Sequence, residues 1–169
     1  RLDSIVRAPQ FAPDGTLRTA HGYDSITKKW IDADDIAIGD TTPTAMNVAA
    51  ARDLVLWWLQ DFPFADDASA SHAIGMLLQP WLMAWIPDGK SPMWTITASA
   101  AGSGKTLLGQ LASYVYTGQW PDIHTMPSDD DEMRKELVSA LVAKPATFFI
   151  DNMAGDVDSP VLAGALTAG

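Results

Sequence analysis

Residues 99–106, with the sequence SAAGSGKT, constrain the fold of this chain more than any other segment. A lysine and a threonine follow two closely spaced glycines, so the backbone can turn its N–H groups around a phosphate group. Such a loop needs a strand before it and a helix after it, because a helix N-terminus favours an anion. The sequence supplies both: residues 93–98 are a short β-prone run, and apolar residues recur at helical spacing over 107–116. The segment therefore predicts a phosphate-binding loop in an α/β domain.

The loop residues have distinct expected roles toward a bound nucleotide. Gly102 and Gly104 give the backbone its freedom to turn. Lys105 is expected to reach the β- and γ-phosphates of ATP, and the Thr106 hydroxyl is expected to coordinate Mg²⁺. The strict motif has glycine at the position of Ser99, and the serine restricts the turn but removes no ligand. The expected cofactor-binding residues are Ala101, Gly102, Ser103, Gly104, Lys105 and Thr106.

Asp151 is expected to supply the carboxylate that holds Mg²⁺ through water. It ends an apolar run, residues 146–150, that is typical of a buried strand, and it follows Lys105 by 46 residues. Many ATPases carry a glutamate directly after this aspartate as the base that polarises the attacking water, whereas this chain has Asn152. An amide orients water but does not accept its proton as a carboxylate does. We take Lys105, Asp151 and Asn152 as candidate catalytic residues and Thr106 and Asp151 as metal ligands, and the hydrolytic base stays unassigned.

An acidic cluster, residues 129–132, lies where a helix is predicted to begin. Carboxylates at this position cap the first turn and interact favourably with the helix dipole, and this is the interpretation that we favour. The alternative is that Glu132, together with Arg134 or Lys135, faces the nucleotide.

The order of the predicted elements divides the chain into three parts. Residues 1–40 contain short apolar stretches separated by turn signals such as Pro13-Asp14-Gly15, and they form a β-rich lead-in. Residues 41–90 form a helical segment, with one helix that starts at Thr42-Pro43 and a second over 66–85 that Pro80 weakens or kinks. Residues 91–169 follow the order β-α-β-α-β-α, which predicts a parallel sheet between layers of helices. The predicted fold class is α/β, a three-layer P-loop NTPase core that is incomplete at its C-terminus.

Composition limits the partners and the environment of the protein. The formal net charge of −10 argues against a nucleic-acid grip over the whole chain, so any DNA contact is local or lies outside these residues. The absence of cysteine excludes disulfides and thiolate metal sites and suits a reducing compartment, and we expect the protein to be cytoplasmic. The most apolar run, residues 73–86, is interrupted by Gln79 and Pro80 and is too short to span a bilayer, so we expect no membrane partner.

Tryptophans cluster in the helical segment and just after it. We expect this cluster to pack the helix pair against a neighbouring domain. The other interpretation, a base-stacking platform, lacks the interleaved lysines and arginines that such a platform needs. The residues are Trp57, Trp58, Trp81, Trp85 and Trp94.

Several short motifs, taken in their order of occurrence, resemble the ATPase region of primase-helicase proteins from phages, plasmids and integrated mobile elements. The resemblance covers residues 7–169, and it implies the AAA+-like fold of superfamily 3 helicases. Those helicases assemble as rings, in the expected case hexamers, and translocate on single-stranded or forked DNA. The motifs are Pro13-Asp14-Gly15, Gly22-Tyr23-Asp24, Asp61-Phe62-Pro63-Phe64, the loop from Ala101 to Thr106, Glu132 with Arg134-Lys135, Asp151-Asn152, and Leu162 with Leu166-Thr167.

By position, the resemblance implies that Lys105 and Thr106 bind phosphate and Mg²⁺ and that Asp151 serves the metal with Asn152 beside it. It also implies that the γ-phosphate sensor, the arginine finger and the hairpin that grips DNA lie beyond Gly169. The chain alone is therefore expected to hydrolyse ATP weakly or not at all, and its DNA contacts are expected in regions outside it.

Three functions follow from these observations. We expect the ATP-binding and hydrolysing domain of a ring-forming DNA helicase that serves mobile-element DNA replication. A P-loop kinase of a small molecule or nucleotide is the first alternative; its lid usually carries several arginines, but Arg134 is the only arginine after residue 52. A nucleotide-binding module without hydrolysis is the second, and in it Asn152 reflects lost chemistry.

Overall fold

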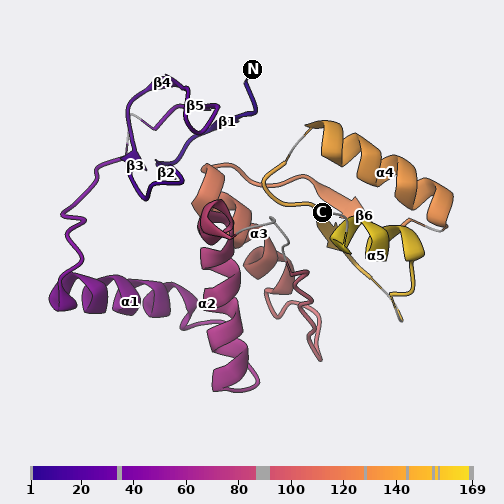
Figure 1. Ribbon diagram of the computed structural model, residues 1–169. Helices are drawn as coiled ribbons and strands as arrows, with labels where there is room; N and C mark the ends of the chain where they lie inside the picture. Colours follow the sequence, from indigo (N-terminus) through magenta and orange to yellow (C-terminus); the bar gives the residue numbers. More distant parts are fainter. Residues whose placement is uncertain are drawn as a thin grey trace.

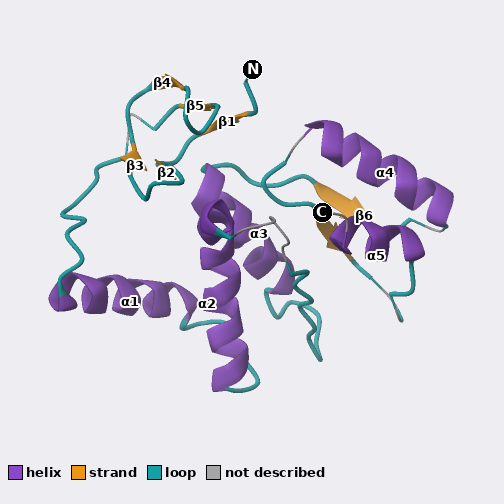
Figure 2. Cartoon of the chain, in the orientation of Figure 1, coloured by secondary structure: helices purple, strands orange, loops and turns teal. Residues whose placement is uncertain are grey.

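The computed structural model describes residues 2–33, 36–86, 92–127, 129–143, 145–153, 155 and 157–167. Five short strands come first, then two helices, and then a mixed α/β part (Figures 1 and 2). The strands of the first part are β1 (Ser4–Val6), β2 (Gln10–Phe11), β3 (Leu17–Arg18), β4 (Gly22–Asp24) and β5 (Lys29–Ile31). The helices that follow are α1 (Ala45–Leu59), α2 (Asp67–Leu82) and the short 3-10 helix η1 (Met83–Trp85). The last part contains α3 (Lys105–Thr117), β6 (Ile123–Thr125), α4 (Asp130–Ala143), β7 (Phe149–Asp151) and α5 (Pro160–Thr167).

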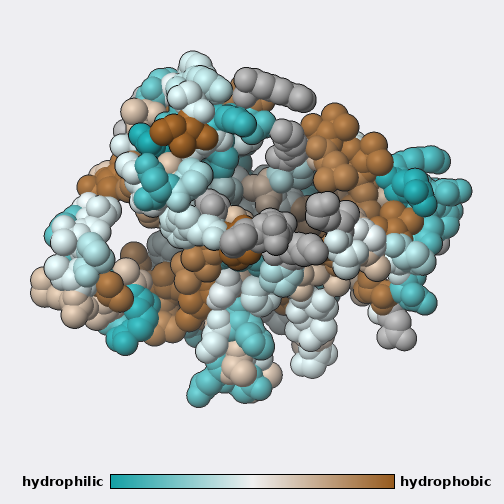
Figure 3. Space-filling model, viewed as in Figure 1, coloured by the Kyte–Doolittle hydropathy of each residue, from teal (hydrophilic) through white to brown (hydrophobic). Residues whose placement is uncertain are grey.

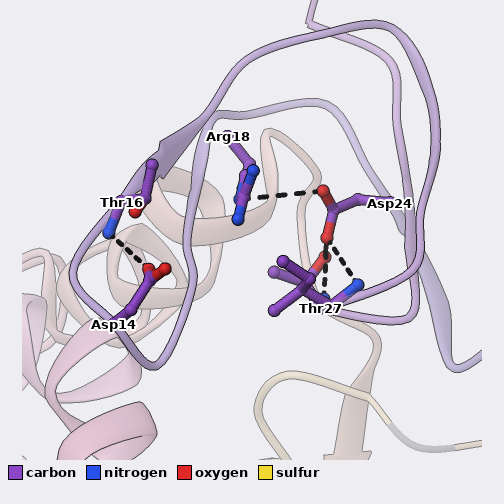
Figure 4. A network of polar contacts seen from close by, with 6 residues as sticks. Asp14, Thr16, Arg18, Asp24 and Thr27 are labelled. Carbon is purple, nitrogen blue, oxygen red and sulfur yellow. Dashed lines mark hydrogen bonds and ion pairs between the residues drawn. The ribbon is translucent and has the colours of Figure 1, made fainter.

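The lead-in consists of a three-stranded sheet, in the order β1-β5-β4, and a β2-β3 hairpin. Its turns are held by carboxylates that accept local hydrogen bonds, as the turn signals in the sequence predict. The Asp14 side chain accepts from the Thr16 N–H at 2.8 Å, and Asp24 accepts from the Thr27 N–H at 2.7 Å (Figure 4). Arg18 lies 3.8 Å from Asp24 and links the hairpin to the sheet.

The lead-in is fastened to the C-terminal end of α3. The Gln10 side chain is 1% exposed and donates to the Tyr116 carbonyl at 2.8 Å, while its own oxygen accepts from Lys29 Nζ at 2.6 Å. The backbone N–H of Arg7 donates to the Thr117 carbonyl at 2.5 Å. The last carbonyls of a helix have no partner within the helix, so these bonds satisfy groups that would otherwise need water.

The two helices of the middle part begin at side-chain caps and share a core with α3. The predicted start at Thr42-Pro43 is wrong by two residues: α1 begins at Ala45, because the Thr44 hydroxyl accepts from the Asn47 N–H at 3.1 Å. The second predicted helix is present as α2, which continues through Pro80 before η1. The shared core is formed by Leu59, Ala73, Met76, Leu77, Leu108 and Ala112.

Apolar side chains also lie at the surface, in several separate groups on the face that Figure 3 shows. The tryptophans of the cluster differ in whether they pack against other parts of the chain. Trp81 packs edge-on against Tyr116, and Trp85 packs against Phe11. Trp57 and Trp58 of α1 are exposed. The helix pair therefore uses part of the cluster to contact the lead-in and α3 and leaves part of it uncovered.

The mixed α/β part contains two parallel strands. Ile123 of β6 pairs with Phe149 of β7, and Thr125 pairs with Asp151. Helix α3 contacts β7, and α4 contacts α5. Residues 93–98, expected as a third strand, form no strand because no described segment pairs with them, although Ile96 packs against the shared core. The predicted three-layer sheet thus stays a prediction, of which the described residues contain a two-stranded parallel part.

Candidate functional site

The loop before α3 has the backbone that its glycines predict. Gly102 has φ +76° and Gly104 has φ +84°, both in the left-handed region that side chains other than glycine rarely adopt. Helix α3 begins directly afterwards at Lys105. The Lys105 and Thr106 side chains thus leave the first turn of the helix, next to the loop.

Helix α3 is also the one α-helix in the described part of the chain whose N-terminus has no side-chain cap. Its N-cap is Gly104, which has no side chain to offer. The other four helices have caps, in which Thr44, Asp66, Asp129 and Ser159 accept N–H groups of the first turn. The first N–H groups of α3 therefore lack a side-chain acceptor at the positive end of the helix dipole, which is the arrangement that a phosphate group requires.

Thr106 and Asp151 meet at this end of α3. The Thr106 hydroxyl donates to Asp151 Oδ2 at 2.9 Å, across 45 residues of sequence. The other oxygen of the carboxylate, Oδ1, accepts from the Asn152 N–H at 2.8 Å. The two residues that the sequence assigned to Mg²⁺ are thus adjacent, and the carboxylate orientation is fixed by a donor on each oxygen.

Asn152 contributes through its backbone in this arrangement. Its φ of +55° is left-handed, which asparagine tolerates better than most residues, and its side chain is exposed. The turn after β7 therefore places the Asn152 N–H against the Asp151 carboxylate. The sequence motif identified Asn152 by its side chain and gave no signal for this backbone role.

Two close contacts set the position of the loop and of β7. A Cβ atom on Gly104 would lie 3.1 Å from Cε1 of Phe62, so the Asp61-Phe62-Pro63-Phe64 segment packs directly on the loop. A Cβ atom on Gly109 would overlap the ring of Phe149, two residues before Asp151. Sequence reasoning missed both contacts: Phe62 was noted only as part of the Asp61-Phe62-Pro63-Phe64 motif, with no role at the loop, and Gly109 belongs to no motif.

The loop residues fit a bound phosphate group and Mg²⁺. The Ser103 hydroxyl is buried and has no hydrogen-bond partner among the described residues. Those residues also contain no group of three His, Asp or Glu side chains that could hold a metal ion. Mg²⁺ is commonly held by one or two protein oxygens together with substrate phosphates, so the hydroxyl of Thr106 and the carboxylate of Asp151 are a sufficient set.

The acidic cluster has structural roles at the start of α4. Asp129 caps the helix by accepting from the Glu132 N–H at 2.9 Å. Asp130 accepts from the Ser159 hydroxyl at 2.6 Å and ties α4 to the start of α5. Glu132 is exposed, as are Arg134 and Lys135. These contacts agree with the favoured capping interpretation of the cluster.

Comparisons with family models, with curated proteins and with solved structures give no match for this chain. Among the described residues, no helix combines the length and the hydrophobicity that crossing a bilayer requires. The assignment of a function therefore depends on the geometry of the loop and of Asp151.

Proposed function

We propose that this chain binds ATP with Mg²⁺ at the loop formed by residues 99–106, as the ATPase part of a ring-forming DNA helicase. The observation that carries the proposal is the hydrogen bond between Thr106 and Asp151 beside the uncapped N-terminus of α3. Folding by itself does not require a threonine hydroxyl and a strand-end carboxylate to lie next to each other at the start of a helix. As the metal pair of a phosphate-binding loop, they have to be neighbours.

Each residue has a role that follows from its position. The N–H groups at the start of α3, with those of the loop, bind the phosphate oxygens, and Lys105 adds a positive charge. Thr106 and Asp151 hold Mg²⁺, which when bound neutralises charge on the β- and γ-phosphates. The Asn152 N–H keeps the Asp151 carboxylate turned toward Thr106. No hydrolytic base is assigned, because Asn152 cannot accept a proton.

The helicase part of the proposal is supported by the order of motifs along the chain and by the ATP site to which two of them belong. In this proposal the protein is a cytoplasmic homo-oligomer, a hexameric ring, that acts on single-stranded or forked DNA during mobile-element replication. Regions outside these 169 residues supply the arginine finger and the main DNA grip.

Nucleotide titration with and without Mg²⁺ tests the ATP site. Lys105→Ala is expected to weaken binding of a fluorescent ATP analogue by about tenfold or more, as the loss of a charge-assisted contact to phosphate predicts. Asp151→Asn is expected to remove most of the effect of Mg²⁺ on affinity. Lys135→Ala and Asp158→Asn, which change exposed residues of the same types, serve as matched controls and are expected to bind as the unaltered chain does.

The same titration contradicts the proposal if Mg²⁺ leaves the affinity unchanged or if Lys105→Ala binds ATP normally. Turnover separates the functional alternatives. Hydrolysis that single-stranded DNA stimulates and Lys105→Ala abolishes supports the helicase. Phosphorylation of an added acceptor points to a kinase, and binding without turnover points to a module without hydrolysis, for which Asn152 is the supporting feature.

A further inference from the structure

The segment Asp61-Phe62-Pro63-Phe64 connects α1 to α2 (Figure 1) and places one aromatic ring against the phosphate loop. A Cβ atom on Gly104 would lie 3.1 Å from Cε1 of Phe62 and 3.4 Å from Cδ1, so one edge of the ring faces this glycine. At Gly102, the other glycine of the loop, no atom of the described residues lies within 4 Å of the corresponding position. The ring therefore supports the loop at its Gly104 end.

The backbone of Phe62 is held on both sides. Its N–H donates to the Leu59 carbonyl at 3.1 Å, and Leu59, the last residue of α1, is 3% exposed in the core that α1 and α2 share with α3. Its carbonyl accepts from the Phe64 N–H at 2.9 Å, and the Phe64 side chain packs against the same core. The Asp66 carboxylate then caps α2 by accepting from the Ser69 N–H at 2.7 Å. Because the turn is anchored at both ends, the Phe62 ring is a fixed support for the loop.

Gly104 is the point at which the loop becomes helix α3. It is the N-cap, and its carbonyl accepts the first hydrogen bond of the helix, from the Leu108 N–H at 2.9 Å. The N–H groups expected to bind phosphate oxygens follow directly, on Lys105 and Thr106. Glycine has more backbone conformations available than any other residue, so an unsupported Gly104 would present these groups in several orientations. The ring excludes those in which Gly104 moves toward the turn between α1 and α2.

We propose that Phe62 is a positioning residue of the ATP site, whose ring holds Gly104 in the conformation that binds phosphate. The ring acts through the loop and needs no contact with the nucleotide. N–H groups that are ordered before the anion arrives bind it more tightly than mobile ones, because binding then loses less conformational entropy. The inference rests on the proposed function, and it adds the turn between α1 and α2 to the elements that determine the affinity for ATP.

This role makes the effect of Phe62 depend on the phosphates of the ligand and not on its base. The contact with Gly104 acts on the part of the site that binds phosphate, so loss of the ring is expected to weaken ATP and inorganic tripolyphosphate by the same factor. The Thr106–Asp151 pair depends instead on how α3 packs on β7. The ratio of affinities with and without Mg²⁺ is therefore expected to stay as in the unaltered chain. A ring that stacked on the base would weaken ATP alone.

Isothermal titration calorimetry with ATP and with inorganic tripolyphosphate, each with and without Mg²⁺, tests the proposal. Phe62→Ala is expected to weaken both ligands by about 5-fold to 30-fold, the range that corresponds to ordering the backbone of one residue. Phe62→Tyr keeps the ring and is expected to bind as the unaltered chain does. Phe64→Ala is the matched control: Phe64 is also half-buried and packs against the same core, but none of its atoms lies within 4 Å of the Cβ position on Gly104.

A second variant keeps the test decisive if Phe62→Ala does not fold, which urea unfolding followed by tryptophan fluorescence shows. Phe62→Leu retains most of the apolar volume that packs against the core, and such changes are well tolerated. Leucine has no counterpart of Cε1, the atom of Phe62 nearest to Gly104. Phe62→Leu is therefore expected to weaken both ligands by one common factor, of about 5-fold.

The outcomes distinguish this inference from the proposed function. If Lys105→Ala loses ATP while Phe62→Ala binds as the unaltered chain does, the inference is wrong and the ATP site stands. If Phe62→Ala and Phe64→Ala weaken ATP equally, the loss comes from the core and not from the contact with Gly104, and the inference is again overturned. If Phe62→Ala weakens ATP but not tripolyphosphate, the ring contacts the nucleoside, which contradicts the positioning role. If Lys105→Ala binds ATP normally, the proposed function fails and this inference fails with it.

Discussion

Gly109→Ala is the substitution for which the structure makes the sharpest prediction. Gly109 is buried in the middle of α3, where alanine normally stabilises a helix by about 1 kcal/mol relative to glycine. A Cβ atom at this position would overlap the Phe149 ring and would lie 3.0 Å from its Cζ and 3.3 Å from Cδ1 of Ile96. Carbon atoms pack best at about 3.5 to 4.0 Å, so both neighbours have to move.

The magnitude follows from a comparison with Gly75→Ala in α2. A Cβ atom on Gly75 would meet Trp94 at 3.4 Å, which is ordinary contact, so this control gains the helix preference and little else. Overpacking in a core costs about 1 to 3 kcal/mol. Since the helix preference is the same in both variants, the free energy of unfolding is expected to be about 1 to 3 kcal/mol lower for Gly109→Ala than for Gly75→Ala.

Urea unfolding followed by tryptophan fluorescence measures this difference. Gly75→Ala is expected to raise the midpoint and Gly109→Ala to lower it relative to Gly75→Ala, with equal slopes. The nucleotide site provides a second readout. Phe149 and Asp151 share β7, so displacement of the ring is expected to move the carboxylate from Thr106 and to reduce the effect of Mg²⁺ on ATP affinity. If both variants raise the midpoint equally and keep the Mg²⁺ effect, α3 does not pack on β7 as described.

Two further predictions concern the lead-in. Gln10→Ala is expected to lower the free energy of unfolding by about 1 to 3 kcal/mol, because it removes a buried side chain and leaves the half-buried Tyr116 carbonyl without the donor that Gln10 supplies. In urea unfolding, Gln119→Ala is the control, since that side chain donates only a long 3.4 Å hydrogen bond to the Ile5 carbonyl. Equal losses of unfolding free energy in the two variants would contradict the role given to Gln10. The hydrogen bond from the Thr27 N–H lowers the pKa of the Asp24 carboxyl. The ionised carboxylate therefore stabilises the folded chain above the usual carboxyl pKa, and this stabilisation is lost as the pH falls through the lowered pKa. Asp24→Asn is therefore expected to lower the melting temperature at pH 6 and to flatten its decline below about pH 4, and an unchanged profile would argue against this role.

The elements that the sequence predicted well are those with strong local signals. Helix α1 ends at Leu59 before Asp61-Phe62-Pro63, and α3 ends at Thr117 before Gly118, whose φ of +70° is one that glycine adopts most readily. Helix α5 begins at Pro160 after the Ser159 cap. In each case a single residue restricts its own backbone or caps the adjacent turn, so the residues next to a helix end are enough to predict where the helix begins or ends.

Residues 93–98 show where local signals fail. Their alternation and β-branched residues predict a strand, but a strand exists only when another segment pairs with it, and none of the described segments does. Three exposed apolar side chains on the sheet of the lead-in are a similar case. Ile5, Tyr23 and Trp30 are separate in sequence, and only the register of β1, β5 and β4 makes them neighbours.

The sequence by itself determined the loop, since Gly102, Gly104, Lys105 and Thr106 are adjacent and their chemistry is local. It also identified Asp151 as the residue that ends an apolar run. Only the tertiary structure decided that the Thr106 hydroxyl and the Asp151 carboxylate lie 2.9 Å apart, because 45 residues separate them and their distance depends on how α3 packs on β7. That packing is made possible by the missing side chain of Gly109, which no motif marks.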